Sequence, residues 1–177
     1  MLINMQPKKF YISWKRVLIF VLLFCIIGII VYVALLYRAI EQNRTEGFTD
    51  ANQFVLEHST IEEIERTSYF QANQGYFVME GNDKDKRSFY VFLGDNQPLT
   101  AEDLYIVPTT ESISAEIIEQ TLLKECDGCT LINTTPAMIN QYPLWELTYY
   151  DEYNRYVIEY KYLENGKTFE KIKLSKN

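Results

Sequence analysis

The chain contains one long apolar run, Val17–Tyr37, in which 21 consecutive residues carry no charge. A helix of this length spans roughly 31 Å, close to the thickness of the hydrocarbon core of a bilayer. The alternative is a buried core helix, which would need covering on every side, and the rest of a 177-residue chain is too short to supply that cover. The run therefore predicts one membrane-spanning helix between residues 1–16 and residues 38–177.

Charged residues on the flanks predict the direction of this helix. Four basic residues precede the run: Lys8, Lys9, Lys15 and Arg16. The basic residues that follow it are diluted by glutamates, so the positive-inside rule places residues 1–16 in the cytoplasm and the C-terminal part outside the cell. A cleaved signal peptide would have a shorter apolar run followed by a site of small residues, and the sequence has neither. We expect a single-pass protein of the cell membrane.

The part after the run is acidic and rich in aromatic residues. It holds all 24 acidic residues and 13 of the 17 basic ones, a net charge of −11 against −7 for the whole chain. Such a charge disfavours binding to nucleic acid or to anionic lipid headgroups. Aromatic residues make up 15% of the chain, which is typical of a folded, strand-rich structure and not of disorder.

The outer part repeats itself at a spacing of 68 residues. Asp83 and Arg87 match Asp151 and Arg155, and the apolar residues before and after them also match. Each unit reads as a helix, a strand and a hairpin. The sequence thus predicts an α+β fold with two tandem lobes, residues 38–98 and 99–177, each a helix packed on an antiparallel sheet.

Apolar periodicity places the expected elements within the two lobes. A first helix is expected from Arg38 to about Glu57, and Gly47 would allow a joint within it. A second begins after the N-cap Ser114 and ends near Glu125. Its predicted apolar face is Ile117, Ile118 and Leu122. Strands are expected at 61–71, 76–81, 87–93, 130–139, 144–151, 156–162 and 167–174, with a short connecting strand at 104–107.

Residues for catalysis or cofactor binding are scarce in the outer part. His58 is its one histidine, no glycine-rich phosphate loop occurs, and no serine, histidine and aspartate spacing resembles a triad. Glu63 and Glu65 would share one face of a strand, as a hydrolytic carboxylate pair requires, but a solvated face is the simpler interpretation. We therefore expect no catalytic residue, metal, cofactor or small-molecule substrate.

Cys126 and Cys129 form a C-x-x-C motif after the second helix. Redox use would favour a cysteine at a helix N-terminus, whereas this pair lies at a C-terminus. A zinc site would need two further ligands, and His58 is the one histidine available. A local disulfide is the preferred interpretation, with two free thiols, or a redox or metal role, as alternatives.

Side chains alternate between the two faces of a strand, which predicts the buried side of each sheet. In the second lobe the predicted buried face combines Trp145, Leu147 and Tyr149 with Tyr156, Ile158 and Tyr160. In the first lobe Phe77, Met79, Tyr90 and Phe92 are expected to face the helix. The opposite face would then be apolar as well: Tyr76, Val78, Phe89, Val91 and Leu93. Either the second lobe covers these five residues or they form a docking surface for a membrane partner.

Two stretches resemble the cell wall elongation regulator TseB family, also called YpmB-like. They are GYFVMEGNDKDKRSFYVFLGDN (Gly75–Asn96) and LWELTYYDEYNRYVIEYKYLENGKTFEKIKL (Leu144–Leu174). The resemblance covers most of the chain, including the membrane run. It implies a single-pass membrane protein of low-GC Gram-positive bacteria whose outer part is two PepSY-like or cystatin-like lobes. It also implies a non-enzymatic role, in which the outer part binds and modulates a penicillin-binding protein during peptidoglycan synthesis.

Two other functions remain open. PepSY-like lobes are linked to extracellular accessories of sensor kinases and to protease modulators, and a membrane-anchored wall hydrolase is the enzymatic alternative. The Cys126–Cys129 turn is not a feature associated with the TseB family.

Overall fold

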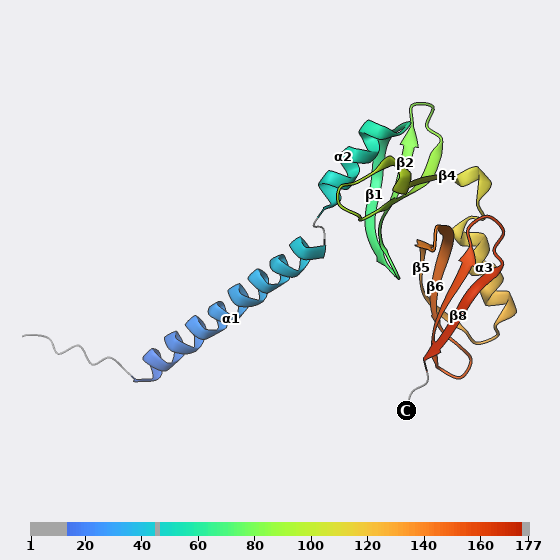
Figure 1. The fold of residues 1–177 in the computed structure, drawn as a ribbon. Coiled ribbons are helices and arrows are strands. Elements are labelled where there is room, and N and C mark those ends of the chain that lie inside the picture. The colour runs from blue at the N-terminus through green and yellow to red at the C-terminus, as the bar shows by residue number, and fades with distance from the viewer. Residues whose placement is uncertain (1–13, 45–46, 175–177) are drawn as a thin grey trace, which may run out of the picture. The chain divides into compact units, whose positions relative to one another are not determined.

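The structure is a computed structural model that describes residues 14–44 and 47–174. The chain divides after Arg44 into two compact units (Figure 1). The first unit contains one long helix, and the second contains two lobes, each with a helix and a four-stranded sheet. The predicted α+β fold is confirmed. Residues 1–13, most of the segment expected in the cytoplasm, lie outside the described residues.

Helix α1, Trp14–Arg44, contains the whole apolar run. Its side chains from Val17 to Tyr37 are exposed, as a lipid-facing surface would be. Among the described residues it is the one helix long and apolar enough to cross a membrane. This finding fits a membrane anchor and also a signal sequence, so the retention of the helix and its direction across the membrane stay predictions.

The expected helix from Arg38 to Glu57 is not continuous. Helix α2, Phe48–His58, begins after Gly47, whose φ of 81° lies in the left-handed region that favours glycine. A Cβ atom at Gly47 would also lie 2.9 Å from the ring of Phe77. Backbone conformation and close packing therefore both require glycine at this joint.

The sheet of the first lobe has the order β1-β2-β3-β4, and all its neighbours are antiparallel. Its strands are β1 (Ile61–Gln71), β2 (Gly75–Asp83), β3 (Ser88–Gly94) and β4 (Leu104–Pro108). Strand β4 was expected as a connection, but it pairs with β3 as the fourth strand of this sheet. The first lobe therefore continues past the expected boundary between residues 98 and 99.

The second lobe begins with α3, Ala115–Glu125, and its sheet has the order β5-β6-β7-β8. The strands are β5 (Thr130–Ile139), β6 (Tyr142–Tyr150), β7 (Tyr156–Tyr162) and β8 (Thr168–Leu174). The Ser114 hydroxyl accepts the N–H of Ile117, as expected of an N-cap. Ile118 and Leu122 are buried against the sheet, but Ile117 is 55% exposed and does not belong to the buried face.

Strand register corrects the predicted faces of the first sheet. Phe77 lies opposite Leu93, and Met79 lies opposite Val91. The β2–β3 hairpin sets this register, because the Asp83 N–H donates to the Arg87 carbonyl and odd-numbered residues then pair with odd-numbered ones. Three of the five candidate surface residues, Phe89, Val91 and Leu93, therefore pack with Ala51 and Val55 of α2 in the core of the lobe.

The other two candidate surface residues, Tyr76 and Val78, lie on the opposite face with Phe92. The second lobe contributes Met138 to this cluster, and Tyr76, Val78 and Phe92 are 3%, 2% and 0% exposed. Nearby, the ring of Tyr90 meets Trp145 edge to face at a centroid distance of 5.4 Å. The second lobe therefore covers Tyr76, Val78 and Phe92, and these residues do not form an open docking surface.

The second sheet needs the same correction. Its hairpin pairs Asp151 with Arg155, which places Leu147 opposite Glu159 and Trp145 opposite Lys161. The face that packs under α3 therefore carries Val157, Glu159 and Lys161, not the predicted Tyr156, Ile158 and Tyr160. The charged side chains of Glu159 and Lys161 are therefore buried inside the lobe, although they were expected on its solvent-exposed face.

Candidate functional site

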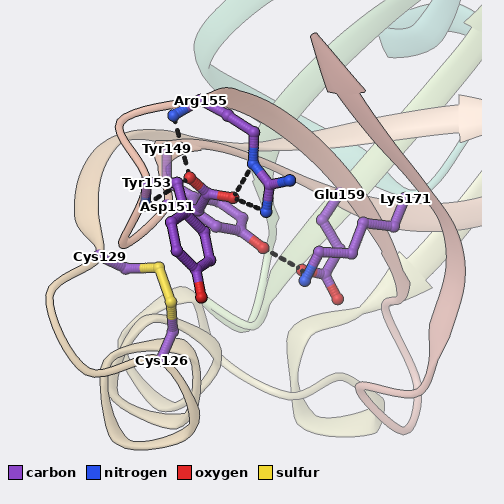
Figure 2. Close-up of polar contacts among 8 residues, drawn as sticks. All are labelled: Cys126, Cys129, Tyr149, Asp151, Tyr153, Arg155, Glu159 and Lys171. Carbon is purple, nitrogen blue, oxygen red and sulfur yellow. Dashed lines mark hydrogen bonds and ion pairs between the residues drawn. A yellow bond between two sulfur atoms is a disulfide. The ribbon is translucent and has the colours of Figure 1, made fainter. Parts of the chain in front are cut away.

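Glu159 is the centre of a buried polar cluster between the second sheet and α3. The residue is 4% exposed. Its Oε2 accepts the hydroxyl of Tyr149 at 2.7 Å, and its Oε1 accepts the hydroxyl of Thr168 at 2.9 Å. Figure 2 shows Tyr149 reaching across from β6 and Lys171 from β8 toward this carboxylate.

Two lysines neutralise the carboxylate. Lys171 Nζ lies 3.0 Å from Glu159 Oε2, and Lys161 Nζ lies 3.6 Å from Oε1. The Lys161 side chain is 7% exposed, and its ammonium group also lies 3.8 Å from the carboxylate of Glu125 on α3. Buried charges are tolerated in folded proteins when they are paired in this way.

The surroundings determine which groups carry charge. Burial would raise the pKa of Glu159, but hydrogen bonds from Tyr149, Lys171 and Thr168 outweigh it and hold the pKa below its ordinary value. Burial raises the pKa of Tyr149 to about 12, and the bond to Glu159 adds to that shift. Burial lowers the pKa of Lys171, but its contacts with Tyr149 and Glu159 raise it overall. At neutral pH the cluster holds a carboxylate, a phenol and an ammonium group.

The β6–β7 hairpin beside this cluster is organised by Asp151. Its Oδ1 accepts the backbone N–H groups of Tyr153 and Arg155 at 3.0 and 2.9 Å. Its Oδ2 receives Arg155 Nε at 2.8 Å and Nη2 at 2.7 Å, a two-pronged contact (Figure 2). The hydrogen bond from Arg155 is the main cause that lowers the pKa of Asp151.

The first lobe repeats this hairpin atom for atom. Asp83 Oδ1 accepts two backbone N–H groups, and its Oδ2 receives Arg87 Nε at 2.7 Å and Nη2 at 2.6 Å. Lys86 and Asn154, at the same place in the two hairpins, have φ values of 62° and 56°. The 68-residue repeat seen in the sequence is therefore a structural repeat, and the Asp–Arg contact, present in both lobes, closes each hairpin.

Cys126 and Cys129 form a disulfide in the structure (Figure 2). Cys126 directly follows α3, where its N–H donates to the Leu122 carbonyl at 2.9 Å, and Cys129 packs against the core of the lobe. The disulfide thus closes the turn from α3 to β5. The redox state of the pair in the cell stays a prediction. In residues 14–44 and 47–174, no three histidine, cysteine, aspartate or glutamate side chains are placed to hold a metal ion.

A cavity of about 290 Å³ opens beside the cluster. It is lined by Leu122, Glu125, Cys126, Tyr149, Asp151, Glu152, Arg155, Glu159, Lys171 and Lys173. Asp151 and Glu159 have lowered pKa values, so neither is set up to give a proton at neutral pH. The arrangement suits a structural network that holds α3, the hairpin and β8 together.

The other residues considered from the sequence lie elsewhere. His58 ends α2, where its Nδ1 lies 3.0 Å from the Phe54 carbonyl oxygen and its ring stacks on Phe54. Glu63 and Glu65 are exposed, and a strand irregularity interrupts the alternation that would place them on one face. The structure therefore does not bring them together with His58 or with Glu159.

Sequence reasoning missed the Glu159 cluster, although the hairpin contained a signal for it. A five-residue Asp-to-Arg hairpin pairs its first and last residues, and continuing that register places Glu159 opposite Leu147. The prediction instead placed Tyr156, Ile158 and Tyr160 of β7 on the buried face, because aromatic and aliphatic residues are usually buried.

Comparisons with known proteins support the fold. No protein-family model and no curated protein matches the chain. Among solved structures, the YpmB protein from Bacillus subtilis is similar, with a TM-score of 0.65 and 22% identity over 72% of this chain and 98% of that one. A candidate lipoprotein from Clostridium difficile 630 is less similar, with a TM-score of 0.35 and 14% identity over 71% of this chain and 91% of that one. The likeness to YpmB shows a shared fold.

Proposed function

We propose that the chain is a membrane-anchored, extracellular and non-enzymatic regulator of cell wall elongation that binds a penicillin-binding protein. The combination of an apolar N-terminal helix with a two-lobed fold like that of YpmB carries this proposal. The choice of a penicillin-binding protein as the partner rests on the resemblance of the two hairpin stretches to the TseB family. The Glu159 cluster is consistent with a non-enzymatic role, since the Glu159 carboxyl group has a lowered pKa and is paired with Lys171.

The proposal requires the lobes to be outside the cell. A reporter enzyme that is active only outside the membrane, fused after Asn177, should be active in cells. The same reporter fused before Met1 should be inactive and serves as the control. An inactive C-terminal fusion, or a mature chain that begins near Arg38, would contradict the retained anchor with its N-terminus inside.

Partner binding can be tested by crosslinking in living cells of a low-GC Gram-positive host. The full chain, tagged at its C-terminus, is crosslinked, purified from detergent extracts and probed with a fluorescent penicillin, which labels penicillin-binding proteins covalently. We expect one labelled protein to be enriched. The control is residues 1–46 fused to an unrelated extracellular domain, which keeps the anchor and removes both lobes.

The alternatives give different results in the same experiment. If no labelled protein is enriched above the control, the proposed partner is wrong. Recovery of a sensor kinase or a membrane protease instead would support the accessory or modulator function. Cleavage of purified peptidoglycan by the full chain would contradict the non-enzymatic role.

A further inference from the structure

A second cavity, of about 410 Å³, lies where the β1–β2 turn of the first lobe meets the β5–β6 turn of the second. Its volume falls within the range of small-molecule sites, about 300–1,000 Å³. Four carboxamide side chains line it: Asn73, Gln74, Asn140 and Gln141. None of its lining residues is an aspartate, glutamate, lysine or arginine, although the outer part of the chain is strongly charged.

The carboxamides come from both lobes and are available to a ligand. Asn73, Asn140 and Gln141 are exposed, and Gln74 is partly exposed. One hydrogen bond of 3.4 Å, from Asn73 Nδ2 to Asn140 Oδ1, joins the two turns. Each carboxamide has two N–H donors and one carbonyl acceptor, so most of this hydrogen-bonding capacity is free for hydroxyl or amide groups.

The β5–β6 turn carries two of the carboxamides on left-handed backbone positions. Asn140 and Gln141 have φ values of 50° and 66°, and the flanking residues Ile139 and Tyr142 pair across the turn. Two-residue turns with positive φ at both positions favour Asn followed by Gly. Glutamine at the second position costs roughly 1–2 kcal/mol that glycine would avoid.

The floor of the cavity is apolar. Tyr76, Met138 and Ile139 are 3%, 0% and 8% exposed. The Tyr76 hydroxyl donates to Gln74 Oε1 at 3.4 Å. The cavity therefore combines a small apolar floor with walls that both donate and accept hydrogen bonds and carry no charge.

We propose that this cavity binds a neutral N-acetylated hexosamine unit of a glycan. Sugar hydroxyls donate and accept at once, which matches carboxamides better than charged groups, and the acetamido methyl group suits the apolar side chain of Ile139, which is 8% exposed. An anionic sugar is disfavoured, because no cationic residue lines the cavity and the outer part is acidic. This inference goes beyond the proposed partner and does not depend on it.

The test uses the full chain in a detergent without a sugar headgroup, titrated with the trimer of N-acetylglucosamine. Side-chain amide signals in ¹H–¹⁵N spectra report on each carboxamide. We expect the signals of Gln74, Asn140 and Gln141 to shift. Gln141→Gly should weaken binding about tenfold, the usual loss for a few removed hydrogen bonds. Glycine suits the positive φ, so this variant should fold at least as stably as the wild type.

Asn154→Gly is the matched control, because Asn154 also has a positive φ but lies at the other end of β6. It should bind the trimer like the wild type. No shift at about 10 mM trimer, ten times a weak Kd of 1 mM, would overturn the site. Equal binding by N-acetylmuramic acid would overturn the neutral selectivity. Equal binding by a capped alanine tripeptide would overturn the saccharide class.

Discussion

Replacing Glu159 by glutamine removes one negative charge from the interior of the second lobe and changes the shape very little. A carboxamide has one acceptor oxygen, so it cannot keep the bonds from both Tyr149 and Thr168. The ammonium group of Lys161, on a side chain that is 7% exposed, then loses its nearest partner and keeps only Glu125 at 3.8 Å. The variant therefore leaves a buried positive charge poorly compensated.

The size of the effect follows from these contacts. Breaking a buried ion pair by removing one partner costs about 3–5 kcal/mol. Lys171 is 38% exposed and can turn toward water, so its share of the loss is screened. We expect the free energy of unfolding to fall by about 2–3 kcal/mol in Glu159→Gln at pH 7.

The stability difference between wild type and Glu159→Gln should become smaller as the pH falls. The folded pKa of Glu159 lies below its ordinary value of 4.5. Its charge therefore stabilises the folded state above about pH 4.5, and this contribution is lost as the pH falls through the lower, folded pKa. Wild type and variant should thus approach each other in stability below pH 4.5 and differ by a constant amount from pH 6 to 8.

Denaturant unfolding of the full chain in mild detergent measures this difference. Trp145 fluorescence reports on the second lobe, in a Trp14→Phe background that removes the other tryptophan. Glu170→Gln is the control, because Glu170 is an exposed carboxylate on β8, and its loss should cost less than 0.5 kcal/mol. A Glu159→Gln variant that is as stable as this control, or equally destabilised at every pH, would refute the reasoning.

Three further predictions use the same unfolding measurement. Ser114→Ala removes the N-cap of α3 and should cost about 0.5–1 kcal/mol; an unchanged midpoint would contradict the cap. Lys86→Gly should stabilise by about 0.5 kcal/mol, and Asn154→Gly by less, because asparagine tolerates positive φ better than lysine; a loss at Lys86 would contradict this. Cys126→Ser with Cys129→Ser should cost less than about 3 kcal/mol, the value for a 15-residue loop, since these cysteines are only 3 positions apart; a larger loss would mean that the disulfide holds more than its own turn.

The hairpins and most strand positions could be predicted from the sequence, because these depend on local patterns. The polar segments at 82–86 and 151–155 stand between β-rich runs, and both are hairpins in the structure. Strand β4 was found at its expected place, but its membership in the first sheet was not. Pairing of β4 with β3 is a long-range choice that the local pattern of five residues does not contain.

The prediction of which side chains lie on the buried face of each sheet was partly wrong. Strand parity gives two sets of side chains, but it does not say which set of one strand lies beside which set of the next. The hairpin determines this pairing, because the backbone hydrogen bonds from Asp83 to Arg87 and from Asp151 to Arg155 set the register of the two strands. The helices show a related shift: Ala51 and Val55 correspond in packing to Ile118 and Leu122, one position away from the 68-residue spacing. The turn between β1 and β2 and that between β5 and β6 differ in length, which accounts for this shift.

The repeat shows that two core positions that are apolar in the first lobe carry charged residues in the second. At the spacing of 68 residues, Val91 and Leu93 of the first lobe correspond to Glu159 and Lys161 of the second, and both pairs lie on the face under the helix. Apolar residues at such positions are often as stable as a buried ion pair, or more stable. A pair of apolar residues at these two positions could therefore stabilise the second lobe as well as the charged pair does. What the charged pair adds is a set of directional contacts: Glu159 on β7 is bonded to Tyr149 on β6 and to Thr168 and Lys171 on β8.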